Sequence, residues 1–131
     1  MDQRVEQAQR LFWEIERLRQ QGACRLITRK LLEMARLHES RARELLAQHD
    51  PDGWIDWYAA ITARAESGCL VEASGFVREG RALAAFFPEG RANIEGQLDD
   101  LETWVRSLQV RVVPALGEYA RQLPALPAEA A

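Results

Sequence analysis

The sequence has too few cysteines for a small disulfide-stapled fold and lacks the long apolar run of a membrane-spanning helix. Its 131 residues include two cysteines, Cys24 and Cys69, whereas a small disulfide-stapled fold needs many more. The two lie far apart in apolar surroundings, without a CxxC spacing or a neighbouring histidine. We therefore expect buried free thiols, and neither a metal site nor a cofactor. No stretch approaches the roughly 18 apolar residues of a membrane span, and charge begins at the second residue. A cytoplasmic protein without membrane contact is expected.

Signatures of catalysis are also missing from the sequence. It has two histidines, His38 and His49, and neither follows a glutamate by three residues, as a di-iron site in a helical bundle requires. Neither a Gly-x-Ser-x-Gly elbow nor a glycine-rich phosphate loop occurs. We therefore assign no catalytic residue and favour a protein that is not an enzyme.

The composition is that of one compact domain. Apolar residues make up 47% of the chain and charged residues 28%, which excludes an intrinsically disordered protein. The net charge is −3, with ten basic and eight acidic residues in 1–50 but seven and twelve in 51–131. Nearly every arginine of the first half has an acidic residue within one helical turn. The dense positive face of a nucleic-acid-binding domain is therefore not expected.

Apolar residues recur at steps of three and four residues along four segments, which is typical of amphipathic helices. The stripes cover residues 3–21 with Ala8, Leu11, Phe12, Ile15 and Leu18; 23–48 with Ile27, Leu31, Met34, His38, Ala42 and Leu45; 54–87 with Trp54, Tyr58, Ile61, Ala65, Cys69, Phe76, Leu83 and Phe87; and 91 onward with Ile94, Leu98, Leu101, Val105, Leu108, Val112, Leu116 and Tyr119. Short turns separate the segments, so neighbouring helices should be antiparallel. We predict an all-α, antiparallel four-helix bundle with long helices. Residues 1–123 would form a single domain and residues 124–131 a flexible tail.

Two positions leave alternatives for the helix boundaries. The helical spacing of apolar residues continues across Gly68 in the same register, which favours a single helix over 54–87. A break near Ser67-Gly68 is the alternative. Pro114 interrupts the last stripe. It should either kink that helix or divide it, and division would give a short fifth helix after Pro114.

Four large apolar residues lie off the stripes of the first two predicted helices: Trp13, Leu26, Leu32 and Leu37. A tryptophan flanked by arginines, here Arg10 and Arg17, is typical of a protein interface. Either the segment after Pro114 covers these four residues, or a protein partner or a second copy of the chain does. We favour a partner surface with Arg10 and Arg17 as its rim, and self-association as a homodimer.

Polar residues also lie on the apolar stripes. Arg19 and Glu72 fall at similar heights if 54–87 is one helix, so we predict that they form a buried ion pair. His38 lies at the centre of the second stripe. We expect it to be a hydrogen-bonded core histidine and not a ligand.

Arg43 and His49 have five residues between them. This spacing is similar to the Arg-x(4–6)-His element of HEPN ribonucleases, four-helix proteins in which dimerisation brings two such pairs together and the histidine acts in acid/base cleavage of RNA. Glu44 stands where the family commonly has Asn, Asp or His after the arginine. The resemblance covers seven residues and implies an alternative function, RNA cleavage by Arg43 and His49.

A row of arginines on one face of the second predicted helix gives another alternative, a nucleic-acid-associated module: Arg25, Arg29, Arg36 and Arg43. Because acids are interleaved with this row, we favour a solvated helix face. The main hypothesis is a non-catalytic protein that acts by protein–protein contact, as an adaptor, a chaperone-like factor or a small subunit of a larger assembly.

Overall fold

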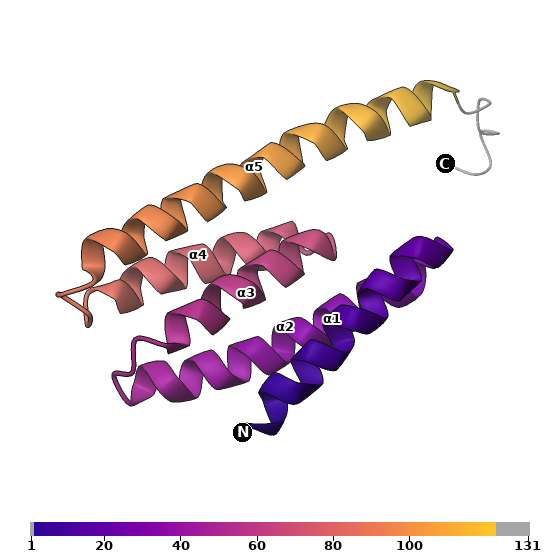
Figure 1. Ribbon diagram of the computed structural model, residues 1–131. Coiled ribbons are helices and arrows are strands. Elements are labelled where there is room, and N and C mark those ends of the chain that lie inside the picture. The colour runs from indigo at the N-terminus through magenta and orange to yellow at the C-terminus, as the bar shows by residue number, and fades with distance from the viewer. Residues whose placement is uncertain (1, 123–131) are drawn as a thin grey trace, which may run out of the picture.

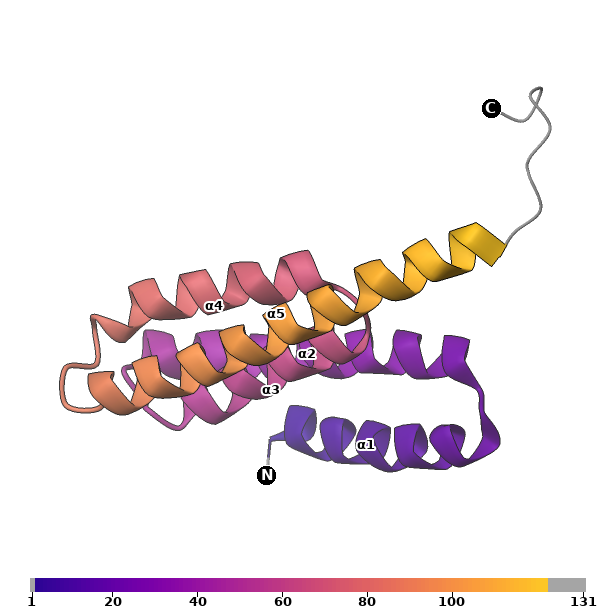
Figure 2. The same cartoon turned by 90° about the horizontal axis from the view of Figure 1, so that it is seen from above.

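The computed structural model describes the backbone of residues 2–122 and the side chains of residues 2–109. This part of the chain is all-helical, as predicted, and has five helices (Figure 1). They are α1 (Gln3–Gln21), α2 (Cys24–Ala47), α3 (Gly53–Glu66), α4 (Leu70–Ala84) and α5 (Arg91–Gln122). Successive helices reverse direction, so α1, α3 and α5 run one way and α2 and α4 the other (Figures 1 and 2). No described helix is long and apolar enough to cross a membrane.

The prediction of a single helix over 54–87 was wrong. The segment forms two helices, α3 and α4, because the helix breaks at Ser67-Gly68-Cys69. Gly68 has a φ of 91°, a left-handed conformation that glycine adopts without strain. The Cys69 N–H then donates to the Arg64 carbonyl at 2.9 Å, which closes the end of α3. The apolar phase survives the break because α3 and α4 fold back on each other and face one core.

For the last helix, a division at Pro114 was considered, and the structure has one continuous helix. The backbone of α5 is helical without interruption from Arg91 to Gln122, so Pro114 does not start a separate fifth helix. A proline removes its own N–H from the hydrogen-bond ladder, and the bonds on either side can carry the helix past it. The predicted flexible tail, residues 124–131, lies outside the described residues.

The central helix is α3, which packs against α2, α4 and α5. The main cluster of buried side chains comes from α2 to α5: Ala42, Leu46, Trp54, Trp57, Ile61, Ala65, Ala73, Val77, Ala84, Ile94, Leu98 and Val105. No residue of α1 belongs to this cluster, and among the described residues the backbone of α1 approaches only that of α2. The first helix therefore lies on the outside of the fold.

The close approach of α4 to α3 depends on Gly80. A Cβ at this position would lie 2.8 Å from Nε1 of the buried Trp57 and 3.1 Å from Leu98 Cδ2. Gly80→Ala is therefore expected to destabilise the fold by up to about 2 kcal/mol, after the gain in helix propensity is subtracted from the cost of overpacking.

The matched control is Gly75→Ala in the same helix, because a Cβ there meets nothing within 4 Å. It should stabilise the protein by up to about 1 kcal/mol. Thermal unfolding followed by circular dichroism measures both changes. Equal effects of the two substitutions would contradict the close approach of α3 and α4 at Gly80.

Both cysteines are free, as predicted, but neither is buried. Cys24 is exposed at the first residue of α2, and Cys69 is half-buried at the corner between α3 and α4. The apolar surroundings in the sequence predicted burial wrongly, because each cysteine falls at a helix end, where the chain turns at the surface.

Candidate functional site

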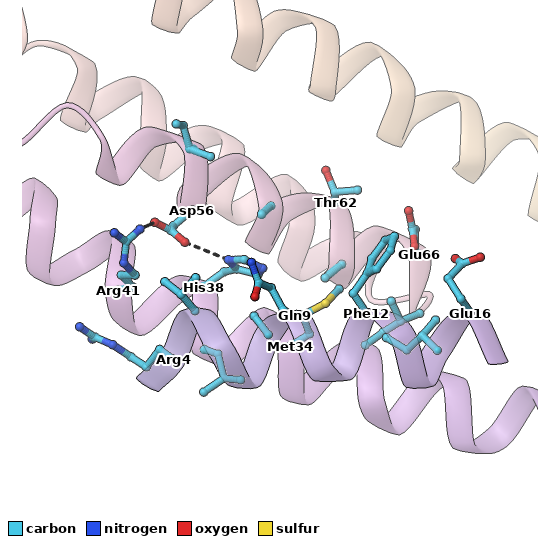
Figure 3. A pocket seen from close by; sticks show the side chains of 18 of the residues that line it. Arg4, Gln9, Phe12, Glu16, Met34, His38, Arg41, Asp56, Thr62 and Glu66 are labelled. Carbon is cyan, nitrogen blue, oxygen red and sulfur yellow. Dashed lines mark hydrogen bonds and ion pairs between the residues drawn. The ribbon is translucent and has the colours of Figure 1, made fainter. Parts of the chain in front are cut away.

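A groove of about 730 Å³ lies between α1 and α3, with α2 as its floor (Figure 3). It exists because α1 and α3 lie on the same side of α2 without touching each other through their backbones. Half of the residues that line the groove are apolar, and they come from all three helices: Val5, Ala8, Phe12, Ile15, Leu31, Met34, Leu37, Ile55, Ala59 and Ala63.

Two large apolar side chains stand open to water at this groove. Phe12 of α1 is 48% exposed and Ile55 of α3 is 71% exposed. Single exposed apolar residues are common on protein surfaces. Two that face one opening from opposite walls indicate a surface that binds something.

A buried carboxylate lies at one end of the groove. Asp56 of α3 accepts a hydrogen bond from Nδ1 of His38 at 2.9 Å, and its other oxygen binds Arg41 (Figure 3). Both donors belong to α2, so the three residues fasten α3 to α2. Burial of a carboxylate is tolerated only when such partners replace water. The prediction that His38 is hydrogen-bonded is confirmed.

The groove does not contain an arrangement for nucleophilic catalysis among the described residues. Nδ1 of His38 donates to the Asp56 carboxylate, so this ring nitrogen is taken up by a contact between α2 and α3. The hydroxyl that lines the groove, on Thr62, donates to the Tyr58 carbonyl at 2.9 Å and not to the histidine, as a nucleophile and base would require. The polar residues thus hold the walls in position.

An ion-pair network joins the start of α1 to α2 at the same end. Asp2 caps α1 by accepting from the Arg4 N–H at 2.8 Å, and the Arg4 guanidinium binds Asp2 at 2.7 Å and Glu44 at 2.5 Å. The Arg4 side chain and backbone N–H lower the pKa of the Asp2 carboxyl to about 2. The network orients the first turn of α1 on α2.

Acid should release this cap in a defined pH window. A carboxylate with a lowered pKa stabilises the folded helix above its ordinary value of 3.8, and this contribution is lost as the pH falls through about 2. The chemical shift of the Arg4 backbone amide proton, followed by NMR between pH 5 and 1.5, is therefore expected to titrate near pH 2. In Asp2→Asn the transition at the amide should vanish. A midpoint near 4 would show that the Asp2–Arg4 contact does not form.

The predicted buried pair of Arg19 and Glu72 does not form. Arg19 instead binds Glu16 at 2.8 Å and Glu66 at 3.0 Å at the other end of the groove, and it is exposed. Glu72, also exposed, binds Arg64 at 2.8 Å. The prediction was wrong because it assumed one helix over 54–87, whereas the reversal at Gly68 carries Glu72 away from the α1 side.

Sequence reasoning missed the buried charges of α3. Arg64 is buried, binds Glu39 at 2.5 Å and Glu72 at 2.8 Å, and lies with its guanidinium carbon 4.7 Å from the centre of the Phe76 ring. The sequence did contain a signal for this burial. Arg64 follows Trp57 by seven residues, or two helical turns, so the two side chains lie on the same face of α3.

The residues predicted as a partner surface do not share one environment. Trp13 is 68% exposed, and its ring packs edge-to-face on Phe12 with centroids 5.4 Å apart. Arg10, Arg17 and Leu26 are exposed, whereas Leu32 and Leu37 are half-buried, with Leu37 in the groove. Sequence reasoning missed Phe12 and Ile55, because Phe12 lay on the predicted core stripe.

The residues of the two nucleic-acid alternatives make different contacts in the structure. Arg43 binds Glu79 at 2.6 Å and Glu39 at 3.0 Å, which raises the pKa of its guanidinium. His49 lies in the turn after α2 at a φ of 59°, with its ring 6.0 Å from that of Phe87. The remaining arginines of the row are exposed on α2: Arg25, Arg29 and Arg36.

Comparison of the chain with protein-family models, with curated proteins and with solved structures gave no match. The groove between α1 and α3 is therefore the basis for a functional proposal.

Proposed function

We propose that the protein acts by protein–protein contact and that the groove between α1 and α3 docks an amphipathic helix. One observation supports this proposal: α1 and α3 both pack on α2 and leave a groove between them, which we interpret as the open fourth corner of a four-helix bundle. In such a bundle, helices on diagonal corners are too far apart for backbone contact. The backbones of α1 and α3 do not approach each other, and the Arg19 side chain reaches Glu66 at one end of the groove. A helix placed opposite α2 would contact both.

The dimensions of the groove fit a helix of about four turns. Its lining on α1 runs from Arg4 to Arg19, which is roughly 22 Å at 1.5 Å per residue. Neighbouring helices pack with axes about 8–10 Å apart, so a docked helix would bring apolar side chains at i, i+3, i+4 and i+7 onto Phe12 and Ile55.

Charge pairing also supports an apolar occupant. Arg4, Arg19 and Arg41 line the groove, and each already binds a carboxylate of the same chain. An occupant with a polar inner face would have to compete with these pairs, whereas an apolar stripe would not. The proposal describes an adaptor, a chaperone-like factor or a small subunit of an assembly. We place it in the cytoplasm, where free thiols such as Cys24 stay reduced.

Site-specific photo-crosslinking tests this function. A benzoyl-phenylalanine is placed at Phe12 or Ile55 in the full chain, which is irradiated in cells of its native host. Both positions should give a discrete protein adduct. The matched control is Val71 on α4, which is 79% exposed and lies outside the groove. No adduct at either groove position, or the same adducts at Val71, would exclude the groove as a docking surface.

A further inference from the structure

We propose that the C-terminal end of α5, residues 110–122, pairs antiparallel with the same segment of a second copy of this chain in a two-fold symmetric homodimer. This surface is separate from the groove of the proposed function. Three features of α5 support the pairing: its length beyond the helices that it packs on, its apolar stripe, and the charges beside that stripe.

The helix α5 is longer than the helices that it packs on. Among the described residues it contacts α3 and α4, and the start of α4 is level with Gln109, since Val71 and Gln109 line one hollow between α4 and α5. Arg81 of α4 binds Asp99 of α5 at 2.6 Å, which fits the same antiparallel register. Residues 110–122 therefore continue past the corner between α3 and α4, by roughly 20 Å at 1.5 Å per residue (Figure 2).

The apolar stripe of α5 does not stop where α3 and α4 stop. Inside the bundle its members are buried or half-buried against the core: Ile94, Leu98, Leu101, Val105 and Leu108. The sequence continues the same spacing past the corner with Val112, Leu116 and Tyr119. At about 100° per residue these three positions stay within roughly 40° of the stripe centre, and the charged residues of 110–122 fall more than about 90° from it. A continuous apolar face on a helix indicates a packing partner.

The charges beside the stripe favour an antiparallel copy of the same segment. Arg111 and Glu118 are two helical turns apart and therefore lie on the same flank of α5. When two helices pair antiparallel, like flanks meet. A pair centred between residues 114 and 115 places position 111 of each copy beside position 118 of the other, and the charges at these positions are opposite. The two-fold axis gives this pairing twice.

A parallel pair would not use these charges. It would place the flank of Arg111 and Glu118 against the other flank of the stripe, where the sequence of 110–122 has no acidic or basic residue. The order of charges is therefore self-complementary in the antiparallel arrangement only.

Pro114 is compatible with this contact. It falls about 160° from the stripe centre, on the face of α5 away from the proposed partner. The backbone of α5 is helical on both sides of it. The apolar face thus passes Pro114 without interruption.

Sedimentation equilibrium of the purified full chain is the first test. The expected mass is twice 14.9 kDa. Leu116→Asp should reduce the mass to that of one chain, because it places a charge in the apolar face, while the far-ultraviolet circular dichroism keeps the signal of a folded helical protein. Ile55→Asp is the matched control, an exposed apolar position in the groove, and should remain dimeric.

These variants also separate this inference from the proposed function. A monomeric wild-type chain, or a dimer that is lost in Ile55→Asp and kept in Leu116→Asp, would overturn the pairing of α5. Neither result removes the groove as a docking site, which is tested by crosslinking at Phe12 and Ile55.

Charge reversal tests the flanks without a change in the apolar face. Arg111→Glu sets acids opposite each other twice and should weaken dimerisation roughly fivefold to thirtyfold. Adding Glu118→Arg to this variant restores opposite charges and should regain most of the affinity. The two positions are roughly 11 Å apart within one helix, so the regain reports a contact between copies. A double variant as weak as Arg111→Glu alone would contradict the pairing.

Disulfide trapping tests the direction of the two helices. In a chain with Cys24→Ser and Cys69→Ser, Ala115→Cys beside the axis should form a covalent dimer under mild oxidation, since facing positions of paired helices come within reach of a disulfide. Tyr119→Cys should not, because its two copies are roughly 14 Å apart along the helices. Disulfides at both positions would show a parallel pair, and no disulfide with Ala115→Cys would place the axis elsewhere. Either result overturns the inference.

Discussion

Trp57→Ala is expected to destabilise the protein by about 3–5 kcal/mol. The indole is fully buried in α3, and its N–H donates to the Phe76 carbonyl at 3.1 Å. Truncation leaves a cavity at the centre of the main cluster and removes that hydrogen bond. Because domains are stable by about 5–15 kcal/mol in total, the variant should be close to unfolding at 25 °C.

Urea unfolding followed by circular dichroism at 222 nm measures this loss at a fixed protein concentration. Phe86→Ala is the control, since Phe86 is an aromatic residue 65% exposed in the turn after α4, and its removal should change the free energy of unfolding by less than about 0.5 kcal/mol. Trp57→Phe keeps most of the volume and should lose less than the alanine variant. Similar midpoints for Trp57→Ala and Phe86→Ala would contradict the central position of α3.

Asp56→Ala is expected to destabilise the protein by about 2–4 kcal/mol. Asp56 is buried and is the shared acceptor for His38 and Arg41, so its removal leaves two donors of α2 without their partner. The loss stays below that of a fully buried pair because both donors retain some contact with water. Asp56→Asn keeps an acceptor oxygen and should lose less.

A double-mutant cycle with His38→Ala identifies the source of this loss. The two substitutions should be coupled by roughly 0.5–3 kcal/mol, because each removes the same hydrogen bond. Asp99→Ala is the control: Asp99 binds Arg81 at 2.6 Å but is exposed, and exposed pairs contribute about 0–1 kcal/mol. Additive effects of Asp56→Ala and His38→Ala would show that the contact does not fasten α3 to α2.

Much of the fold could be predicted from local signals. The apolar periods predicted the helical class and a first helix over 3–21, which matches α1. The residue that follows α1 is Gly22, and its φ of 72° requires the freedom of glycine. The single helix over 54–87 was wrong because periodicity reports which face is buried and not the direction of the chain. A glycine at position 68 is compatible with both alternatives in the sequence, and the reversal is seen only in the tertiary structure, where α4 packs against both α3 and α5.

The groove could be predicted only in part. Trp13 was recognised as an exposed apolar residue because it lies opposite the stripe of its own helix. Phe12 and Ile55 could not be recognised, since Phe12 continues the stripe of α1 and its exposure depends on how far α3 lies from that helix. The same limit applied to Arg19, whose partner proved to be Glu66 and not Glu72.

The sequence by itself determined the helical class, most of the turns and the side of α1 that faces α2, because these depend on backbone preferences and on residue spacing within one helix. The tertiary structure alone decided that α3 is central, that Asp56 and Arg64 are buried, and that α1 stands apart from α3. These features depend on contacts between segments distant in sequence. The spacing of residues along one helix carries no information about such contacts.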